Sequence, residues 1–390
     1  MVSIGFVYFC SVIKNNYELQ NDGTMKNILS KRTFIVLPLF LFSLHPLWGQ
    51  KSNFKNDICI PGKLYMLSDI RNDVFVEALI KRWRPYNDFV RFSGDCVYSR
   101  KLNRVASVDT PVDGSNMKIE LVNSDEFEII KEKAISICVG KKGIGTQEVT
   151  VQILGDSFVN GAFFRDALLS KNYIPGIKLV GLRNIKNEEG QYDEGRGGWT
   201  VKKYFEIPKG EMTSYHGYMQ PVGEYRYWGS CEFWKNCYKV INGELTDTEI
   251  VYNCGRYDQC ITKFDKETGY LAAPKKNDLM YDNARGSYMV YTEKKWKNVE
   301  VDERKWAFNY RKYLDMWNLD APKFFAQMLG LNDYRDSLTA DYREWNKKIA
   351  EMKESYYKAV PDGKFIILIP CTTCGSLNNI RGDFTLRQNA

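Results

Sequence analysis

The chain has 390 residues, enough for two domains or for one large domain with insertions. Its 44% hydrophobic content is ordinary for a globular protein, so composition does not limit the size of the core. The net charge of +7 is spread along the chain without a long basic run, which argues against a nucleic-acid-binding protein.

The N-terminal fifty residues have the order of a secretory signal peptide. Basic residues precede the apolar run FIVLPLFLFSL, residues 34–44, and Gly49 follows as a small residue suited to cleavage. The signal fits best if it begins at Met25. The run is too short to span a membrane as a helix; a short buried helix is the alternative. We therefore expect residues 1–49 to be an upstream extension and a signal peptide. The mature protein would then be exported, to the periplasm or outside the cell, without a stable membrane span.

Nine of the ten cysteines lie beyond this segment, so export would place them where disulfides persist. Cys231, Cys237, Cys254 and Cys260 could staple one region, but the sequence does not give their pairing. A zinc site is not expected, because the CxxC at residues 371–374 has no second pair and the chain has only two histidines. We expect neither a metal nor a cofactor.

Residues 50–147 have the pattern of a β-rich N-terminal domain. The segment MKIELV, residues 117–122, places alternate apolar side chains on one face, and AISICV, residues 134–139, is a second strand candidate. The segment VDTPVDGSN, residues 108–116, has the composition of a turn.

Apolar strands alternate with helical segments in residues 148–390. The strands are expected from Val149 to Leu154 and in GIKLVGL (176–182), KFFAQMLG (323–330) and KFIILIP (364–370), and the helices over 159–172 and 339–360. Such alternation predicts βαβ units and a parallel sheet. A stretch rich in Tyr, Trp and Cys, about residues 204–299, interrupts it and is expected to be an ordered insertion.

Three short motifs follow the first three of these strands. They are Gly155-Asp156-Ser157, the segment EGRGGWT (194–200) and the segment GLND (330–333). Each one alone is more often a tight turn or a helix cap. Their repeated position at strand exits favours a shared site, because ligands bind beyond the carboxyl ends of parallel strands.

These residue types suit acyl transfer. A serine at a strand-to-helix turn can act as a nucleophile, and the tetrahedral intermediate needs donors aimed at its oxyanion. The Ser157 N–H, a glycine N–H of the second motif and the Asn332 amide could supply them. Asp156 and Asp333 are expected to hold the turns through backbone hydrogen bonds.

In this order the three motifs resemble those of the SGNH/GDSL hydrolases, over roughly residue 148 to the C-terminus. The resemblance implies a flavodoxin-like three-layer α/β/α fold with a parallel sheet. It also implies Ser157 as the nucleophile, Asn332 as an oxyanion donor and Gly198 as the glycine donor, with Gly197 the second choice. Family members cleave esters, and exported members with an added β-rich domain often resemble carbohydrate esterases. The expected substrate is a small-molecule or glycan ester.

The family's last motif, DxxH, supplies the general base, and this sequence does not contain it. We therefore expect a C-terminally incomplete fold and an inactive or impaired enzyme. His216 is the only histidine beyond the signal peptide. It is either a base supplied by the insertion or a loop histidine among aromatic residues.

Two other functions are weighed against this one. A glycan-binding, catalytically vestigial protein would use Tyr225, Tyr227, Trp228 and Trp234 as a platform, although a packed, disulfide-stapled subdomain core is the more common explanation for such a density of aromatic residues. A flavodoxin-like nucleotide binder is disfavoured, because the first strand exit lacks a phosphate-binding glycine loop.

Overall fold

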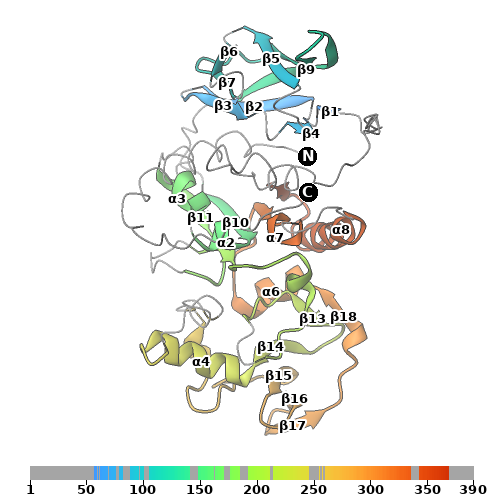
Figure 1. Cartoon of the computed structure of the whole chain (residues 1–390). Helices are drawn as coiled ribbons and strands as arrows, with labels where there is room; N and C mark the ends of the chain where they lie inside the picture. Colours follow the sequence, from blue (N-terminus) through green and yellow to red (C-terminus); the bar gives the residue numbers. More distant parts are fainter. Residues whose placement is uncertain are drawn as a thin grey trace, which may run out of the picture.

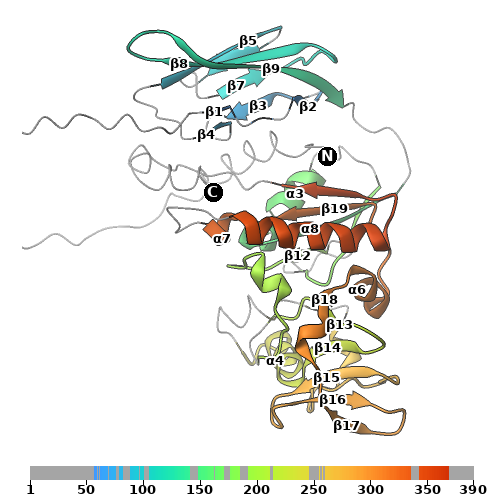
Figure 2. The same cartoon turned by 90° about the vertical axis from the view of Figure 1, so that its right-hand side faces the viewer.

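A computed structural model describes residues 57–368. Gaps fall at 59, 61, 69, 76–78, 82–87, 96, 101–104, 141–147, 162, 171–175, 185–191, 211–213, 246–253, 255–256, 258–259 and 335–341. The expected signal peptide and the CxxC at residues 371–374 lie outside this range. The protein is mixed α/β with several sheets, most of their pairings antiparallel (Figures 1 and 2). Within the described residues, no helix combines the length and the apolar character needed to cross a bilayer.

The first nine strands form a β-rich region. A four-stranded sheet has the order β2 (Lys63–Leu67), β9 (Ile129–Gly140), β8 (Asn116–Asn123), β5 (Asp88–Gly94). A three-stranded sheet has the order β3 (Asn72–Phe75), β7 (Val105–Val108), β6 (Val97–Arg100), and β1 (Asp57–Ile58) pairs with β4 (Ile80–Lys81). The strands predicted over 117–122 and 134–139 are confirmed by β8 and β9. Met117, Ile119 and Leu121 are all buried, as their alternation predicts.

A five-stranded sheet, all parallel, follows. Its main path is β11 (Ile177–Leu179), β10 (Val149–Gly155), β19 (Phe324–Met328), β20 (Lys364–Ile367), and β12 (Glu194–Gly195) pairs with the end of β10. The four predicted strands are therefore present and parallel. Numbered in chain order without β12, they lie as 2-1-3-4.

The two faces of β10 contribute to different cores. Val151 and Ile153 pack with Val159 in one cluster, whereas Leu154 joins Tyr356 in another. The first cluster is covered by α2 (Ser157–Asn160) and α3 (Phe163–Ser170), the second by α6 (Tyr310–Trp317) and α8 (Tyr342–Ala359).

The predicted helices differ in outcome. The helix expected over 339–360 is confirmed by α8, whose buried side is formed by Ile349, Met352 and Tyr356. The single helix expected over 159–172 is wrong in its details, because Gly161 caps α2 and divides it from α3.

The predicted insertion is ordered where it is described. It contains β13 (Met219–Pro221), β14 (Arg226–Ser230), α4 (Cys231–Ile241), β15 (Asp278–Asp282), β16 (Ser287–Tyr291) and β17 (Trp296–Val299), with the 3₁₀ turns η2 (Lys202–Phe205) and η3 (Ile261–Lys263). The turn η4 (Glu303–Lys305) and β18 (Trp306–Phe308) lead back to α6, and α7 (Leu331–Tyr334) follows β19.

The aromatic side chains of the insertion form its core. The rings of Trp234 and Phe264 stack with centroids 3.9 Å apart. Tyr227 and Trp234 are fully buried and Trp228 is 7% exposed. The packed core, which the sequence favours over an exposed sugar-binding platform, is therefore confirmed for these three residues, and Tyr225 is partly buried against the same core.

Candidate active site

The three motifs meet at one edge of the parallel sheet. The Asn332 amide nitrogen donates to the Asp156 Oδ2 at 3.3 Å and to the Trp199 carbonyl oxygen at 3.1 Å. The Asp333 Oδ1 accepts from the Val201 N–H at 3.0 Å. Side chains of the third motif thus bond directly to the first motif and to the segment around the second.

Ser157 begins α2, immediately beyond the end of β10, and is exposed. Its neighbour Asp156 is the N-cap of this helix, because its Oδ1 accepts from the Phe158 N–H at 3.0 Å. A residue in the first helical position has no intrahelical acceptor for its own N–H. Among the described residues neither the hydroxyl nor the N–H of Ser157 has a hydrogen-bond partner, so both face the sheet edge unpaired there.

In the second motif, the backbone of Gly198 is accessible. The Trp199 N–H donates to the Arg196 carbonyl oxygen at 3.3 Å, which closes a tight turn. Gly198 has φ +72°, a conformation that side chains other than glycine adopt only with strain. It is exposed, and no atom lies within 4 Å of the position a Cβ would take. Among the described residues no acceptor pairs with the N–H of Gly198 or of the half-buried Gly197.

Asn332 is engaged differently from the two free backbone donors. An amide nitrogen has two hydrogens, and the Asp156 carboxylate and the Trp199 carbonyl occupy both. To donate to an oxyanion, Asn332 must give up or share one of these bonds. The bond to Asp156 is the longer one and is the one expected to yield.

Both aspartates hold turns, as the sequence indicates. Burial raises the pKa of Asp156 to about 6, the negative charge of Asp333 adds to the rise, and the hydrogen bond from Phe158 opposes it. Burial also raises the pKa of Asp333, against its hydrogen bond from Val201. At neutral pH Asp156 is mainly ionised and accepts from both Phe158 and Asn332.

His216 lies in the aromatic core and not at the sheet edge. It is 1% exposed, with the rings of Trp199 and Tyr204 within 6 Å of its own. Its Nδ1 accepts from the Tyr218 N–H at 3.3 Å and its Nε2 lies 3.0 Å from the Glu206 carbonyl oxygen. Burial, with the nearby Arg196 charge, lowers its pKa to about 3. Because both nitrogens are occupied, His216 is a core histidine and not a base for Ser157.

The sequence did not indicate the charged residues beneath the second motif. Glu194 and Arg196 are fully buried and form an ion pair of 2.7 Å. Arg196 also donates to the Ser214 hydroxyl and the Tyr215 carbonyl, while the Tyr204 hydroxyl lies 2.7 Å from the Gly155 carbonyl oxygen. These buried bonds hold the turn at residues 196–199 in place from its core side. The only sequence signal is a pair of opposite charges flanking a glycine at a strand exit.

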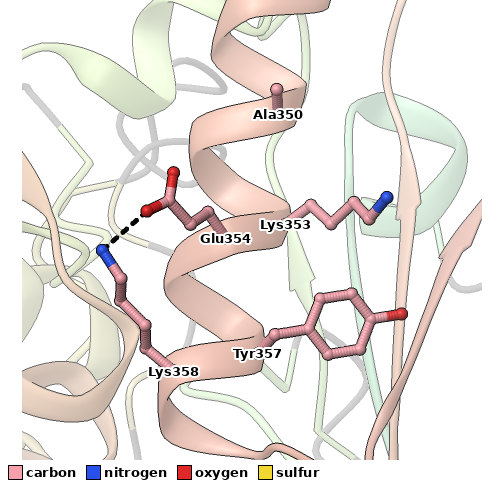
Figure 3. A pocket seen from close by; sticks show the side chains of 5 residues that line it. All are labelled: Ala350, Lys353, Glu354, Tyr357 and Lys358. Carbon is pink, nitrogen blue, oxygen red and sulfur yellow. Dashed lines mark ion pairs between the residues drawn. The ribbon is translucent and has the colours of Figure 1, made fainter.

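Two cavities lie elsewhere. One of about 500 Å³ lies against the outer side of α8, between Lys353, Tyr357 and the Glu354–Lys358 ion pair (Figure 3). Another of about 250 Å³ lies in the insertion beside Trp228 and Lys263. Neither is lined by a residue of the three motifs. In the part of the chain that the structure describes, no group of three or more His, Cys, Asp or Glu side chains could hold a metal ion.

Comparisons with known proteins add little to this geometry. No family model matches the chain, and no curated protein does. One similar crystal structure is that of an alpha-galactosidase candidate from Bacteroides fragilis NCTC 9343, with 13% identity over 32% of this chain and 28% of that chain, and a TM-score of 0.18. Another, an alpha-galactosidase/melibiase candidate from the same organism, has 8% identity over 80% of this chain and 52% of that chain, and a TM-score of 0.19. The chain thus spans about half, or less, of these proteins, and likenesses this low carry no argument about fold or activity.

Proposed function

We propose that this chain carries the nucleophile and the oxyanion hole of a serine ester hydrolase similar to the SGNH/GDSL hydrolases. The observation that carries the proposal is the Asn332 amide, which bonds to Asp156 and to the Trp199 carbonyl. It joins the three motifs beside the exposed Ser157.

The strand order supports the proposal. An order of 2-1-3-4 in a parallel sheet is that of flavodoxin-like folds, in which ligands bind at the carboxyl ends of the strands where the order reverses. Strand β10 lies at this reversal, between β11 and β19, and Ser157 follows it directly.

In the proposed reaction the Ser157 Oγ attacks the carbonyl carbon of an ester while its proton passes to a base. The carbonyl oxygen becomes an oxyanion that accepts from the N–H groups of Ser157 and Gly198. Asn332 joins them by shifting its weaker hydrogen bond from Asp156 to the oxyanion. The intermediate then expels the alcohol and leaves an acyl-serine, which water hydrolyses.

The sequence and the described residues do not supply the histidine base that the resemblance implies. The 390 residues contain no DxxH motif, and His216 is occupied within the core. A serine site without its base retains only the catalysis given by binding and the oxyanion hole. The proposal is therefore an exported esterase for acylated carbohydrates or small esters whose activity in this chain is impaired. No observation favours the alternative of glycan binding, since Tyr227, Trp228 and Trp234 are buried.

The test is p-nitrophenyl acetate hydrolysis by the full chain with and without added imidazole, which can act as a diffusible base. We expect slow hydrolysis alone and an imidazole-dependent rate above that of Ser157→Ala, whose own rate measures the reaction of free imidazole with the ester.

Equal rates for the chain and its Ser157→Ala variant under every condition would contradict the assignment of the nucleophile. Fast, Ser157-dependent hydrolysis by the chain without imidazole would instead contradict the claim that its activity is impaired.

A further inference from the structure

Three buried cysteines lie together in the insertion. Cys237 in α4, Cys254 and Cys260 have no exposed surface, and no disulfide joins any two of them in the structure. The Cys237 Sγ lies 3.9 Å from the Cys254 carbonyl oxygen. Burial, a hydrogen bond with Cys254 and the nearby Cys260 raise the pKa of Cys237.

Clustered cysteines can also bind a metal ion or act as reactive thiols, and these three fit neither role. Described residues offer no metal-binding group of three ligands, so a zinc site is not supported. A reactive thiol needs exposure and a lowered pKa, and Cys237 has the opposite of both. A disulfide needs the Cβ atoms of its two cysteines about 4 Å apart, and the 3.9 Å approach of the Cys237 Sγ to the Cys254 carbonyl oxygen places these two residues side by side.

We propose that Cys237 and Cys254 form a disulfide when the chain folds in an oxidising compartment. The Sγ–Sγ bond forms as both thiols lose their protons, and the two electrons reduce the disulfide of a thiol–disulfide oxidoreductase to two thiols. Because both thiols are fully buried in the folded insertion, the exchange takes place before the insertion has finished folding. The bond ties α4 to a segment 17 positions further along the chain.

The same helix carries a matched control. Cys231 is the first residue of α4, six positions before Cys237, which is about 240° around the helix. After burial, which raises the pKa of its thiol, Asp282 and Tyr270 are the neighbours that act most on this pKa. Cys231 therefore stays a thiol, while Cys260 is the competitor for Cys254.

Trypsin places the four cysteines on separate peptides. They are residues 227–235 with Cys231, 236–239 with Cys237, 240–256 with Cys254 and 257–263 with Cys260. The full chain, secreted into a bacterial periplasm, is unfolded in N-ethylmaleimide, digested without reductant and analysed by mass spectrometry.

We expect peptides 236–239 and 240–256 to be recovered joined, and to separate on reduction, with Cys231 and Cys260 carrying the label. Label on all four cysteines, or Cys254 joined to Cys260, would overturn the proposal.

Two variants extend the test. Cys231→Ser should keep the joined peptides, whereas Cys254→Ser should leave Cys237 labelled. Closing a loop of this length stabilises a protein, so Cys254→Ser should melt about 5 °C or more below the oxidised chain. Reductant should lower the melting temperature of the original chain to a similar extent and leave Cys254→Ser unchanged. The outcome does not depend on ester hydrolysis, so the two proposals can fail separately.

Discussion

At the scale of single residues, Asp156 links the fold to the chemistry. One carboxylate oxygen caps α2 and the other accepts from Asn332. A protonated carboxyl has only one oxygen free to accept, so the two bonds together need the ionised form. Burial nevertheless raises the pKa of this group to about 6. The structure therefore holds an ionised carboxylate where it is costly, next to the exposed Ser157.

This cost gives a pH dependence of known sign. The pKa of Asp156 is about 6 in the folded chain and near 3.8 in the unfolded chain, so the folded state binds more protons between these values. Stability then falls as pH rises through this window and stays lower above it. We expect Asp156→Asn, which keeps the N-cap, to remove this loss, on the order of 2 kcal/mol between pH 4 and pH 7. The measurement is the melting temperature of both proteins at each pH.

Asp302→Asn is the control. Asp302 also caps a turn, through the Arg304 N–H, but hydrogen bonds from Arg304 lower its pKa. The ionised Asp302 carboxylate stabilises the folded chain, and this stabilisation is lost as pH falls. The difference in melting temperature between Asp302→Asn and the original chain should therefore change with pH in the opposite direction to that of Asp156→Asn. A constant difference between Asp156→Asn and the original chain across this range would show that the carboxyl is not destabilised by burial.

At the scale of elements, the second motif contains glycines with different roles. A Cβ on Gly195, in β12, would lie 2.2 Å from the Asn160 backbone nitrogen, so β12 and α2 can approach only because this residue is glycine. A Cβ on Gly198 would meet nothing within 4 Å. Gly195 is therefore required for packing, and Gly198 only for its backbone conformation.

The matched pair Gly195→Ala and Gly198→Ala separates these roles. Gly195→Ala must displace α2 and should destabilise the chain by about 3 kcal/mol or more, or prevent folding. Gly198→Ala should cost about 1 kcal/mol, the strain of a left-handed alanine, and should slow Ser157-dependent hydrolysis by altering an oxyanion donor. Denaturant unfolding and the p-nitrophenyl acetate assay measure the two effects. Unchanged hydrolysis in a folded Gly198→Ala variant would contradict the expected slowing and show that the site does not depend on a glycine at this position, since alanine keeps the backbone N–H.

The sequence predicts those elements whose pattern is local. The alternation of Met117, Ile119 and Leu121 in β8 and the apolar side of α8 are visible in it, because each of these sets is buried against one core. The polar residues inside the protein are not visible. Gln152 interrupts an apolar strand, but its side chain bonds to the hydroxyls of Tyr310 and Tyr313 from α6, some 160 residues away. A contact that distant leaves no trace in the local pattern.

The candidate site could likewise be predicted only in the part that local sequence patterns define. Turn residues at strand exits indicate which residues can meet, since the ends of parallel strands share an edge. They do not show that both hydrogens of the Asn332 amide are occupied, or that Glu194 and Arg196 point inward. These facts depend on packing between segments far apart in the chain.

At the scale of the whole molecule, the hydrophobic residues fall into two groups. One cluster contains only residues between 58 and 139. The other two cover the two faces of the parallel sheet, and the larger one continues from the sheet into the aromatic insertion. Figure 1 shows strands β1–β9 at one end, the insertion at the other and the parallel sheet between them. The insertion is thus part of the α/β unit, because it shares that unit's core.

Separate cores predict separate unfolding. Ile119 in β8 and Phe325 in β19 are both fully buried, one in each group. Truncating either to alanine should cost about 2–5 kcal/mol. We expect calorimetry of the full chain to show two transitions, with Ile119→Ala lowering only one and Phe325→Ala only the other. Val222→Ala, at a position 68% exposed, should lower neither. If instead both core variants shift a single transition equally, the two groups unfold as one cooperative unit, and the site edge then depends on the β-rich region for its stability.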